Sequence, residues 1–281
     1  MDRPNPAHAN EEERNFGLQK RASFTDEGAT VDLIGRIHSD IFFQDRFMLN
    51  EVNVSSTRAK QKDSFCLMSG EPNASYNVKL SSAVLLVHKV QLIPSVFLAQ
   101  AKRSSLDWLN IPSDKTCKTY TIPAENLDGN HEKLFTGQLQ TRLVIGCVDN
   151  DAFNGSYTKN PYNFKNFALS EISIHLGGNT QPVRPLKPNY AGRQCILGLF
   201  SGKGKKNRDE SNDITREDYP KGYALYAFDL NPDLAEEHFN LAKQGTVRVE
   251  LKFGAALPNT VTFVANVEFL YLKTSSRLFA T

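Results

Sequence analysis

The amino-acid sequence predicts an all-β fold, an antiparallel sandwich with a few short helices in its loops. Residues 246–253 (TVRVELKF) alternate apolar and charged side chains, and residues 261–271 repeat this alternation over a longer stretch. Period two is typical of a strand with one buried face, because successive side chains leave the pleat on opposite sides. We therefore expect these residues to form a closing antiparallel strand pair.

Length and charge favour a large core and protein partners. A chain of 281 residues has room for one large all-β domain or two ordinary ones. Its net charge is +2, whereas proteins that coat nucleic acid usually carry a strongly basic face. We therefore expect no specific nucleic-acid binding.

The cysteines and the N-terminus indicate a reducing compartment. The four cysteines are widely spaced and mostly lie in apolar runs, so we expect buried, reduced thiols and no metal site. They are Cys66, Cys117, Cys147 and Cys195. The charged N-terminus is not a secretory signal, and no stretch approaches the roughly 18 apolar residues of a membrane span. A soluble, intracellular protein without membrane contact is expected.

The N-terminal third has weak strand signals. We expect a disordered polar tail at residues 1–27, because that stretch is too polar to bury a core. Short strands are expected within residues 28–70, and a Ser, Gly, Pro and Asn group at residues 71–77 predicts a linker. The expected short strands are residues 31–36, 41–43, 47–54 and 65–68.

The remaining chain, residues 78–274, is expected to form one jelly-roll domain, followed by a tail at 275–281. About eight strands joined by long connections suit two Greek keys closed over one core. Besides the closing pair, the expected strands are 78–97 (ending at Pro94), 115–122, 139–148, 167–176 (with a bulge) and 223–230. Helices are expected at 95–109, 190–200 and 231–242, a charged loop at 203–219, and a polar excursion at 149–166.

Motifs for catalysis, cofactors and metals fail on spacing. The string GLFSGKGKK at residues 198–206 lacks the Gly-Lys-Ser/Thr ending of a phosphate loop. Asp149 and Asp151 resemble the start of a calcium loop, but its closing glutamate is missing. His131 and Glu132 lack the second histidine of a zinc motif. No catalytic residue, cofactor or metal site is predicted.

Five long strings are similar to one known family. They are residues 35–52, 62–68, 126–172, 209–234 and 238–261, beginning GRIHSDIFFQ, KDSFCLM, NLDGNHEKLF, DESNDITRED and HFNLAKQGTV. They resemble the capsid-protein-like family of Maverick/Polinton elements and the related adintoviruses, whose copies lie in many invertebrate genomes. The resemblance covers roughly residues 24–272.

The resemblance implies a structural role. Members of this family are major capsid proteins of the double jelly-roll type, in which three chains form a pseudo-hexameric capsomer. It implies self-association as a homotrimer in a capsid lattice, a minor or penton capsid protein as partner, no active site, and residence in the virion. Such a protein is made in the host cytoplasm, and its assembly is placed there or in the nucleus. Residues 28–70 would be the last strands of a first jelly roll that is mostly missing, so a truncated copy is expected.

Loops and one strand face supply candidate subunit contacts. They are Tyr157, Tyr162, Phe164, Arg216, Asp218, Val264, Leu270 and Leu272. Two alternatives remain. A host jelly-roll module that binds carbohydrate or protein would gather Tyr157, Tyr162 and Phe164 on a concave face. A cupin-type enzyme would bring two or three histidines together inside the barrel.

Overall fold

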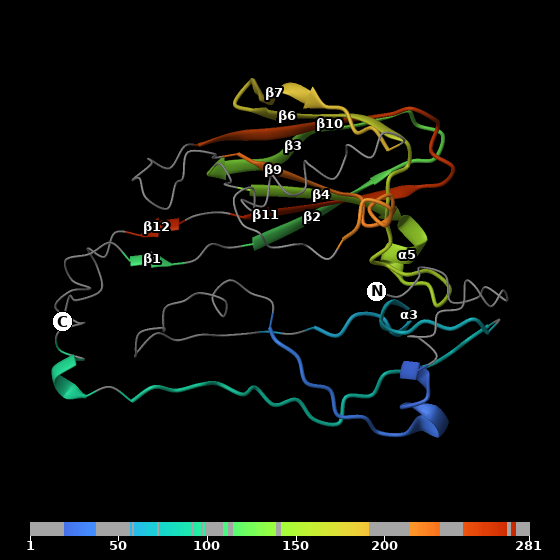
Figure 1. Cartoon of the computed structure of the whole chain (residues 1–281), viewed down its shortest axis with the longest axis vertical. Helices are drawn as coiled ribbons and strands as arrows, with labels where there is room; N and C mark the ends of the chain where they lie inside the picture. The colour runs from blue at the N-terminus through green and yellow to red at the C-terminus, as the bar shows by residue number, and fades with distance from the viewer. Residues whose placement is uncertain are drawn as a thin grey trace.

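Two four-stranded antiparallel sheets face each other across one apolar core in the computed structural model (Figure 1). The structure describes residues 20–37, 57, 59–71, 73–91, 93–96, 98, 109–111, 115–138, 142–190, 214–230, 244–268 and 271–273. The described N-terminal residues run beneath the sandwich in Figure 1, and α3 contacts α5 where the two parts meet.

Strand order identifies the sandwich as a jelly roll. Its strands are β2 (Lys115–Ile122), β3 (Asp128–Gln138), β4 (Arg142–Asp149), β6 (Leu169–Leu176), β7 (Asn179–Leu186), β9 (Leu225–Asp229), β10 (Gln244–Phe253) and β11 (Val261–Glu268). Sheet I has the order β2-β11-β4-β9, and sheet II has the order β3-β10-β6-β7. The first of these strands therefore pairs with the last, and the second with the last but one. This nesting of two Greek keys confirms the predicted fold class.

Smaller elements lie outside the two sheets. Two short strand pairs are present: β1 (Leu109–Ile111) pairs with β12 (Tyr271–Lys273), and β5 (Phe164–Lys165) pairs with β8 (Lys221–Gly222). The helical pieces among the described residues are α3 (Asp63–Cys66), α5 (Asn150–Asn154), a 3-10 turn at Asp26–Gly28, and helical residues at 20–22, 94–96 and 98. The described helices are thus short and lie in connections, as predicted.

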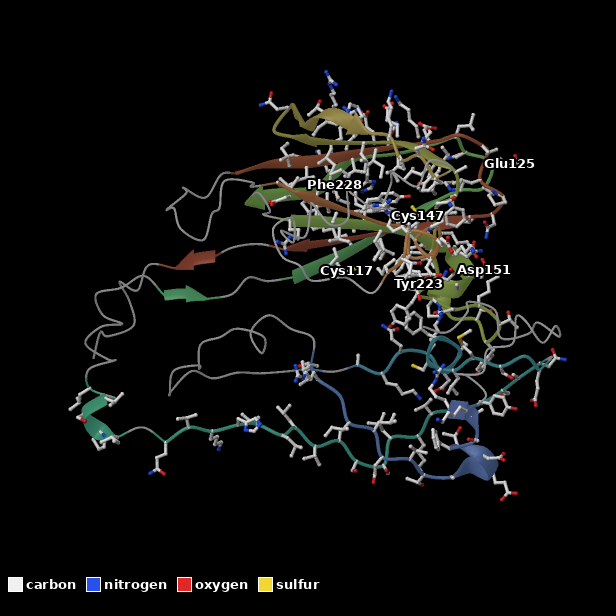
Figure 2. The ribbon with its side chains drawn as sticks, in the orientation of Figure 1. Cys117, Glu125, Cys147, Asp151, Tyr223 and Phe228 are labelled. Atoms are coloured by element: carbon white, nitrogen blue, oxygen red, sulfur yellow. The ribbon has the colours of Figure 1, made fainter. Side chains whose placement is uncertain are left out.

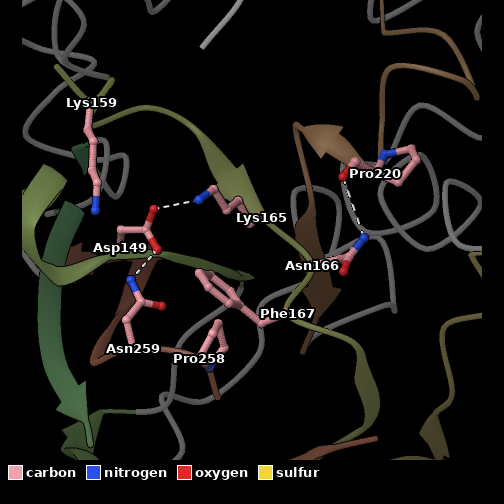
Figure 3. Close-up of a pocket in the computed structure, with 8 residues that line it drawn as sticks. All are labelled: Asp149, Lys159, Lys165, Asn166, Phe167, Pro220, Pro258 and Asn259. Atoms are coloured by element: carbon pink, nitrogen blue, oxygen red, sulfur yellow. Dashed lines mark hydrogen bonds and ion pairs between the residues drawn. The ribbon is translucent and has the colours of Figure 1, made fainter. Parts of the chain in front are cut away.

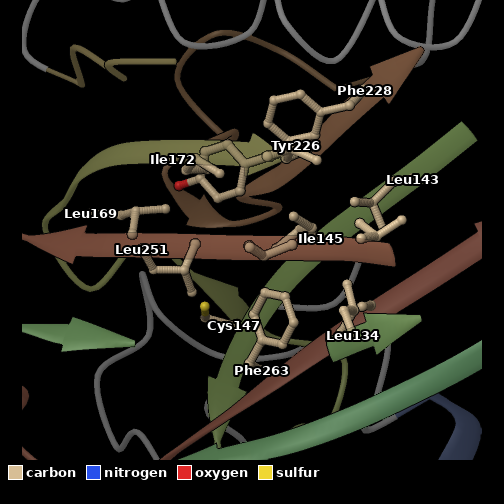
Figure 4. Close-up of a cluster of buried hydrophobic side chains, with 14 of the residues drawn as sticks. Leu134, Leu143, Ile145, Cys147, Leu169, Ile172, Tyr226, Phe228, Leu251 and Phe263 are labelled. Carbon is tan, nitrogen blue, oxygen red and sulfur yellow. The ribbon is translucent and has the colours of Figure 1, made fainter. Parts of the chain in front are cut away.

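Both sheets contribute to one core (Figure 4). Leu143, Ile145 and Phe263 point inward from sheet I and are at most 3% exposed. Leu134 and Ile172 face them from sheet II and are fully buried. Burying an aliphatic or aromatic side chain of this size contributes about 1.5–3 kcal/mol, so this layer dominates the stability of the sandwich.

The strands β10 and β11 have the predicted alternation but do not pair with each other. Val247, Val249 and Leu251 of β10 are each 1% exposed, and Phe263 of β11 is 3% exposed. However, β10 lies between β3 and β6, while β11 lies between β2 and β4. The predicted strand pair is therefore wrong. If β10 and β11 formed one hairpin, their apolar faces would lie on the same side of one sheet. Because the two strands lie in opposite sheets, their apolar faces cover one another.

The outer positions of β2 and β11 differ in charge from the outer face of sheet II, while charge on the outer face of sheet I is found at Arg142 of β4 opposite Asp229 of β9. On sheet II, Lys252 Nζ lies 2.8 Å from Glu171 Oε1, and Arg248 forms an ion pair with Glu250. On sheet I, the described outward side chains of β2 and β11 are uncharged: Cys117, Thr119, Thr121, Thr262, Val264 and Asn266. Water solvates the outer face of sheet II readily, while the outer positions of β2 and β11 are suited to a protein contact.

The predicted strands at residues 31–36, 65–68 and 78–91 are not formed, whereas those predicted at residues 41–43 and 47–54 lie outside the described residues. Residues 31–37 and 78–91 have no regular structure, and residues 63–66 form α3 where a strand was expected. A strand needs a neighbour for its backbone groups, and no strand among the described residues pairs with these segments. Residues 94–96 and 98 are helical, but Leu109 already begins β1, so the helix predicted at 95–109 is wrong at its end.

The other expected elements differ in how well they match. Residues 115–122 form β2 as predicted, and 139–148 and 223–230 correspond to β4 and β9. The bulge in β6 is confirmed, because Lys252 pairs with Glu171 and Phe253 with Leu169, which skips Ser170. The strand β3 was not predicted, since most of its side chains are polar. The helices at 190–200 and 231–242 and loop residues 203–213 lie outside the described residues.

The cysteines also depart from expectation. Cys147 is buried in the core, but Cys66 and Cys117 are exposed free thiols (Figure 2). Cys117 stands between Thr116 and Lys118, and its side chain lies on the outer face of β2, whereas Ile122 of the same strand faces the core. Cys195 lies outside the described residues.

Replacing Leu251 by alanine tests the core. The side chain is 1% exposed at the centre of β10, so Leu251→Ala should lower the free energy of unfolding by about 2–5 kcal/mol in urea denaturation. Leu33→Ala is the matched control, because Leu33 is 92% exposed, and it should stay within about 0.5 kcal/mol of wild type. Equal effects of the two substitutions would contradict this core.

Candidate interaction site

The polar excursion at residues 149–166 begins where β4 ends and carries most of the contacts to the N-terminal part. Its first turn is α5, which is tied to the start of β11 at two points. The Asn150 amide donates to the Thr260 carbonyl at 3.1 Å, and Thr262 Oγ1 donates to Asn150 Oδ1 at 2.9 Å. The excursion therefore leaves the sandwich from a rigid base.

Asp149 is the charged centre of this base. It is 6% exposed, and its carboxylate accepts from Lys165 Nζ at 2.5 Å and from Asn259 Nδ2 at 2.7 Å. Burial alone would raise the pKa of Asp149, but the hydrogen bonds from Lys165 and Asn259 outweigh it and hold the pKa below its ordinary value. The carboxylate stays ionised and links β4 to β5 and to the loop before β11.

Residues 60–78 dock against the excursion through backbone and aromatic contacts. The Ser69 amide donates to the Tyr157 carbonyl at 2.8 Å, and the Tyr157 hydroxyl donates to the Tyr76 carbonyl at 2.9 Å. The rings of Phe65 and Tyr162 meet edge to face, with centroids 5.9 Å apart. Two predicted contact residues, Tyr157 and Tyr162, are thus used within the chain.

Gly155 makes this docking possible. Its φ is +103°, and an added Cβ would lie 2.6 Å from Ser64 Oγ and 3.1 Å from the Phe65 nitrogen. Side chains other than that of glycine are disfavoured by this backbone conformation, and the close approach of α3 leaves no room for one. This position fixes the distance between the excursion and α3.

Phe164 lies on the outer side of sheet I. It begins β5, and its ring covers Gly146 of β4, where an added Cβ would lie 2.6 Å from the Phe164 ring. Nearby, the buried Tyr219 hydroxyl donates to the Leu225 carbonyl at 2.6 Å. The strands β5 and β8 therefore cover part of sheet I, and Phe164 is half-buried against its own sheet.

The other predicted contact residues are scattered. Asp218 is exposed and closes a turn, accepting from Thr215 Oγ1 at 2.7 Å, and Arg216 is exposed in the same turn. Val264 is half-buried on the outer face of β11. Leu270 lies outside the described residues, and for Leu272 only the backbone is described, opposite Asn110. The structure groups Tyr157 and Tyr162 at the excursion and does not gather the full set.

A cavity of about 520 Å³ lies beside the Asp149 base (Figure 3). Its lining residues are Asp149, Lys159, Lys165, Asn166, Phe167, Pro220, Pro258 and Asn259. Lys159 forms a second ion pair, with Asp151 at 2.5 Å. The positive charges of Lys159 and Lys165 are neutralised by the ion pairs with Asp151 and Asp149. The cavity is therefore polar and is stabilised by ion pairs within the chain.

Metal-binding and membrane-spanning features were also sought in the part of the chain that the structure describes. Those residues contain no group of three or more His, Cys, Asp or Glu side chains arranged to hold a metal ion. Of the described histidines, His175 lies on the outer face of sheet II with its Nε2 atom 3.6 Å from Glu250 Oε1. The ring of His131 contacts the ring of Tyr120. Among the same residues, no helix has the length and apolar character of a membrane span.

The chain is similar in sequence to a nematode protein. It is 26% identical over 242 residues to F54H12.2, an uncharacterized protein of Caenorhabditis elegans. That similarity covers 82% of this chain and 57% of the relative, so the chain spans little more than half the length of the relative. No protein-family model matches.

A solved structure is also similar, but weakly. The crystal structure of the STIV MCP, a viral major capsid protein, resembles the chain at 15% identity. The similarity covers 60% of this chain and 45% of that one, with a TM-score of 0.26. Such a score carries no argument, and the jelly-roll assignment rests on strand order.

The sequence did not predict the docking partners. Tyr157 was a candidate from its position in a long polar loop, but Phe65, Ser69 and Tyr76 were read as strand and linker residues. The partners of Asp149 lie 16 and 110 residues away, so no local pattern reveals them. The only signal in the sequence was the length of the excursion.

The Asp149 base predicts a pH-dependent stability. Its folded pKa is lowered, so its contribution is present above the unfolded pKa of about 3.9 and is lost as pH falls through the folded value. Asp149→Asn should therefore cost about 1–3 kcal/mol at neutral pH. In urea denaturation, the difference from wild type should shrink below about pH 4. A difference that is independent of pH would contradict this role.

The docking contact predicts a local change without global unfolding. Gly155→Ala should displace α3, so the Ser69 amide should exchange with solvent about tenfold faster by hydrogen-exchange mass spectrometry or NMR. Gly178→Ala is the control, because Gly178 has a φ of +92° but nothing within 4 Å of the added Cβ. Faster Ser69 exchange in both variants, or in neither, would show that the contact does not form.

Proposed function

We propose that the chain is a virus-derived capsid protein whose copies associate into a shell. The observation that carries the proposal is the jelly-roll strand order, sheet I as β2-β11-β4-β9 and sheet II as β3-β10-β6-β7. The sequence resemblance along residues 24–272 supports the finer reading, a double jelly-roll major capsid protein that forms trimeric, pseudo-hexameric capsomers. A fold alone hosts many functions, so the surfaces must supply the rest of the argument.

The difference between the outer faces supports assembly. A subunit in a shell needs one side that tolerates water and others that contact neighbours. Sheet II carries ion pairs such as Lys252 with Glu171 on its outer side, whereas the described outward residues of β2 and β11 are uncharged. Val264 among these uncharged positions remains a candidate subunit contact, together with Leu270 and Leu272.

The N-terminal residues fit the same proposal. Within it, residues 28–70 belong to the end of a first jelly roll, 71–77 form a linker, and 78–274 contain the second jelly roll. Val31, Leu33 and Ile34 are 37%, 92% and 91% exposed, so this apolar stretch is available for contact with another part of such an assembly. A minor capsid protein as a further partner, and location in the virion, follow from this proposal.

Self-association tests the proposal. Purified full-length chain should form trimers at micromolar concentration in sedimentation equilibrium, because a capsomer is built from three chains. Thr119→Lys together with Val264→Lys should weaken the trimer, since they place charge among the uncharged outer positions of β2 and β11. The control is Arg248→Lys on sheet II. A monomer at every accessible concentration would contradict the proposed function.

A further inference from the structure

An exposed apolar segment precedes the sandwich. The large apolar side chains between residues 80 and 90 are all 52–81% exposed: Leu80, Val84, Leu85, Leu86, Val87 and Val90. Contiguous exposed apolar surface of this kind marks an interaction site in a folded protein. Residues 78–91 have no strand neighbour among the described residues.

The sequence of this segment is that of a strand. Leu80, Ser82, Val84 and Leu86 alternate with their neighbours, and valine and leucine predominate over the next residues. Contacts with the described residues hold the start of the segment: the Val78 amide donates to Asp63 Oδ1 at 3.0 Å, and its carbonyl accepts from Lys60 Nζ at 2.7 Å. The segment beyond it has strand character, and its backbone groups are available for pairing.

The sandwich offers an open edge of matching length. The strand β2 has eight residues and one neighbour, β11, among the described strands. It contains no proline or glycine and is rich in threonine. By contrast, the edge strand β7 of sheet II carries Pro182 and Pro185, which block pairing. The edge of β2 therefore has no proline to block strand addition, although it carries Lys115 and Lys118, and Lys118 Nζ lies 4.8 Å from the centroid of the Phe135 ring.

A slot beside β2 leads into the core. It has a volume of about 300 Å³ and lies between β2 and β3, the neighbouring edge strands of the two sheets. Val249, Leu251 and Phe263 form its floor, and the rings of Tyr120 and His131, with centroids 3.4 Å apart, line its side. A strand added to β2 would place its inward side chains over this opening.

We propose that residues 79–87 of one copy add as an antiparallel fifth strand to the β2 edge of a second copy. This rests on the proposed self-association and names the contact that would produce it. Within one chain, this segment and β2 do not pair. Figure 1 shows residues 78–91 running beneath the sandwich, separated from β2. Strand addition forms hydrogen bonds between the backbone groups of the segment and those of β2. It also covers the apolar side chains that line the slot.

Cys117 provides a direct test. It is an exposed thiol on β2, opposite Asn266, whereas the core thiol Cys147 has its pKa raised to about 12 by burial and should stay unreactive. A donor chain carries one cysteine at a position from 82 to 87 together with Cys117→Ser. An acceptor chain retains Cys117, and the donor and acceptor chains carry different affinity tags. Both chains also carry Cys66→Ser and Cys195→Ser. After mixing and mild oxidation, only contact between copies can give the tagged heterodimer.

The expected result is a disulfide-linked heterodimer whose yield alternates with position, because alternate side chains of a strand lie on the side of Cys117. Leu33→Cys in the donor is the control, because Leu33 is 92% exposed but outside the segment, and it should give background yield. No heterodimer, or a yield equal at all positions and in the control, would overturn strand addition.

A second measurement separates this inference from the proposed function. Val84→Asp with Leu86→Asp should weaken self-association about tenfold or more in sedimentation equilibrium, and Leu33→Asp should not. Both substituted residues are exposed, so the unfolding midpoint should stay that of wild type at a dilution where both proteins are monomeric. Oligomers that persist in the double variant without cross-linking would overturn strand addition alone, whereas a monomeric wild type would contradict both proposals.

Discussion

Each sheet of this protein can bury its apolar face only against the other sheet, and the rest of the structure depends on that constraint. The strands β10 and β11 follow each other in the chain, yet they lie in opposite sheets because their apolar faces must meet. Phe263 and Leu251 come from these two strands and belong to one core. The need to cover both apolar faces also places the first strand of the sandwich, β2, beside the last, β11. The result is the jelly-roll strand order.

Burial of the inner faces leaves the edges and connections to carry interactions. The excursion after β4 is held by the buried carboxylate of Asp149 and is close enough to α3 for Gly155 to be required. The open edges differ, since β7 contains prolines and β2 does not. The two sheets end in four edge strands, β2, β9, β3 and β7, and a β2 edge without proline is consistent with a subunit that binds its own kind.

Sequence reasoning succeeded where the signal was local. Alternation predicted the strands and buried faces of β10 and β11, since the pattern records which side of a strand meets water. Pairing is decided by residues far apart in the chain, and the alternation of Val247 and Phe263 contained no information on their sheets. The strand β3 escaped prediction because it is an edge strand with few apolar residues. Residues 78–91 have a sequence typical of a strand, but no strand among the described residues pairs with them. At the candidate site, the loop containing Tyr157 was identified, but its partners, which lie about 80 residues away, were not.

The central claim is that this jelly roll is a unit completed by its neighbours. Cryo-electron microscopy of the assembled full-length chain would test it most directly, since strands of adjacent copies can be traced at their contacts. The account predicts a shell or capsomer in which each copy retains the jelly-roll order and β2 continues into a strand from another copy. Particles in which β2 faces solvent in every copy, or in which β10 and β11 pair as a hairpin in one sheet, would contradict it.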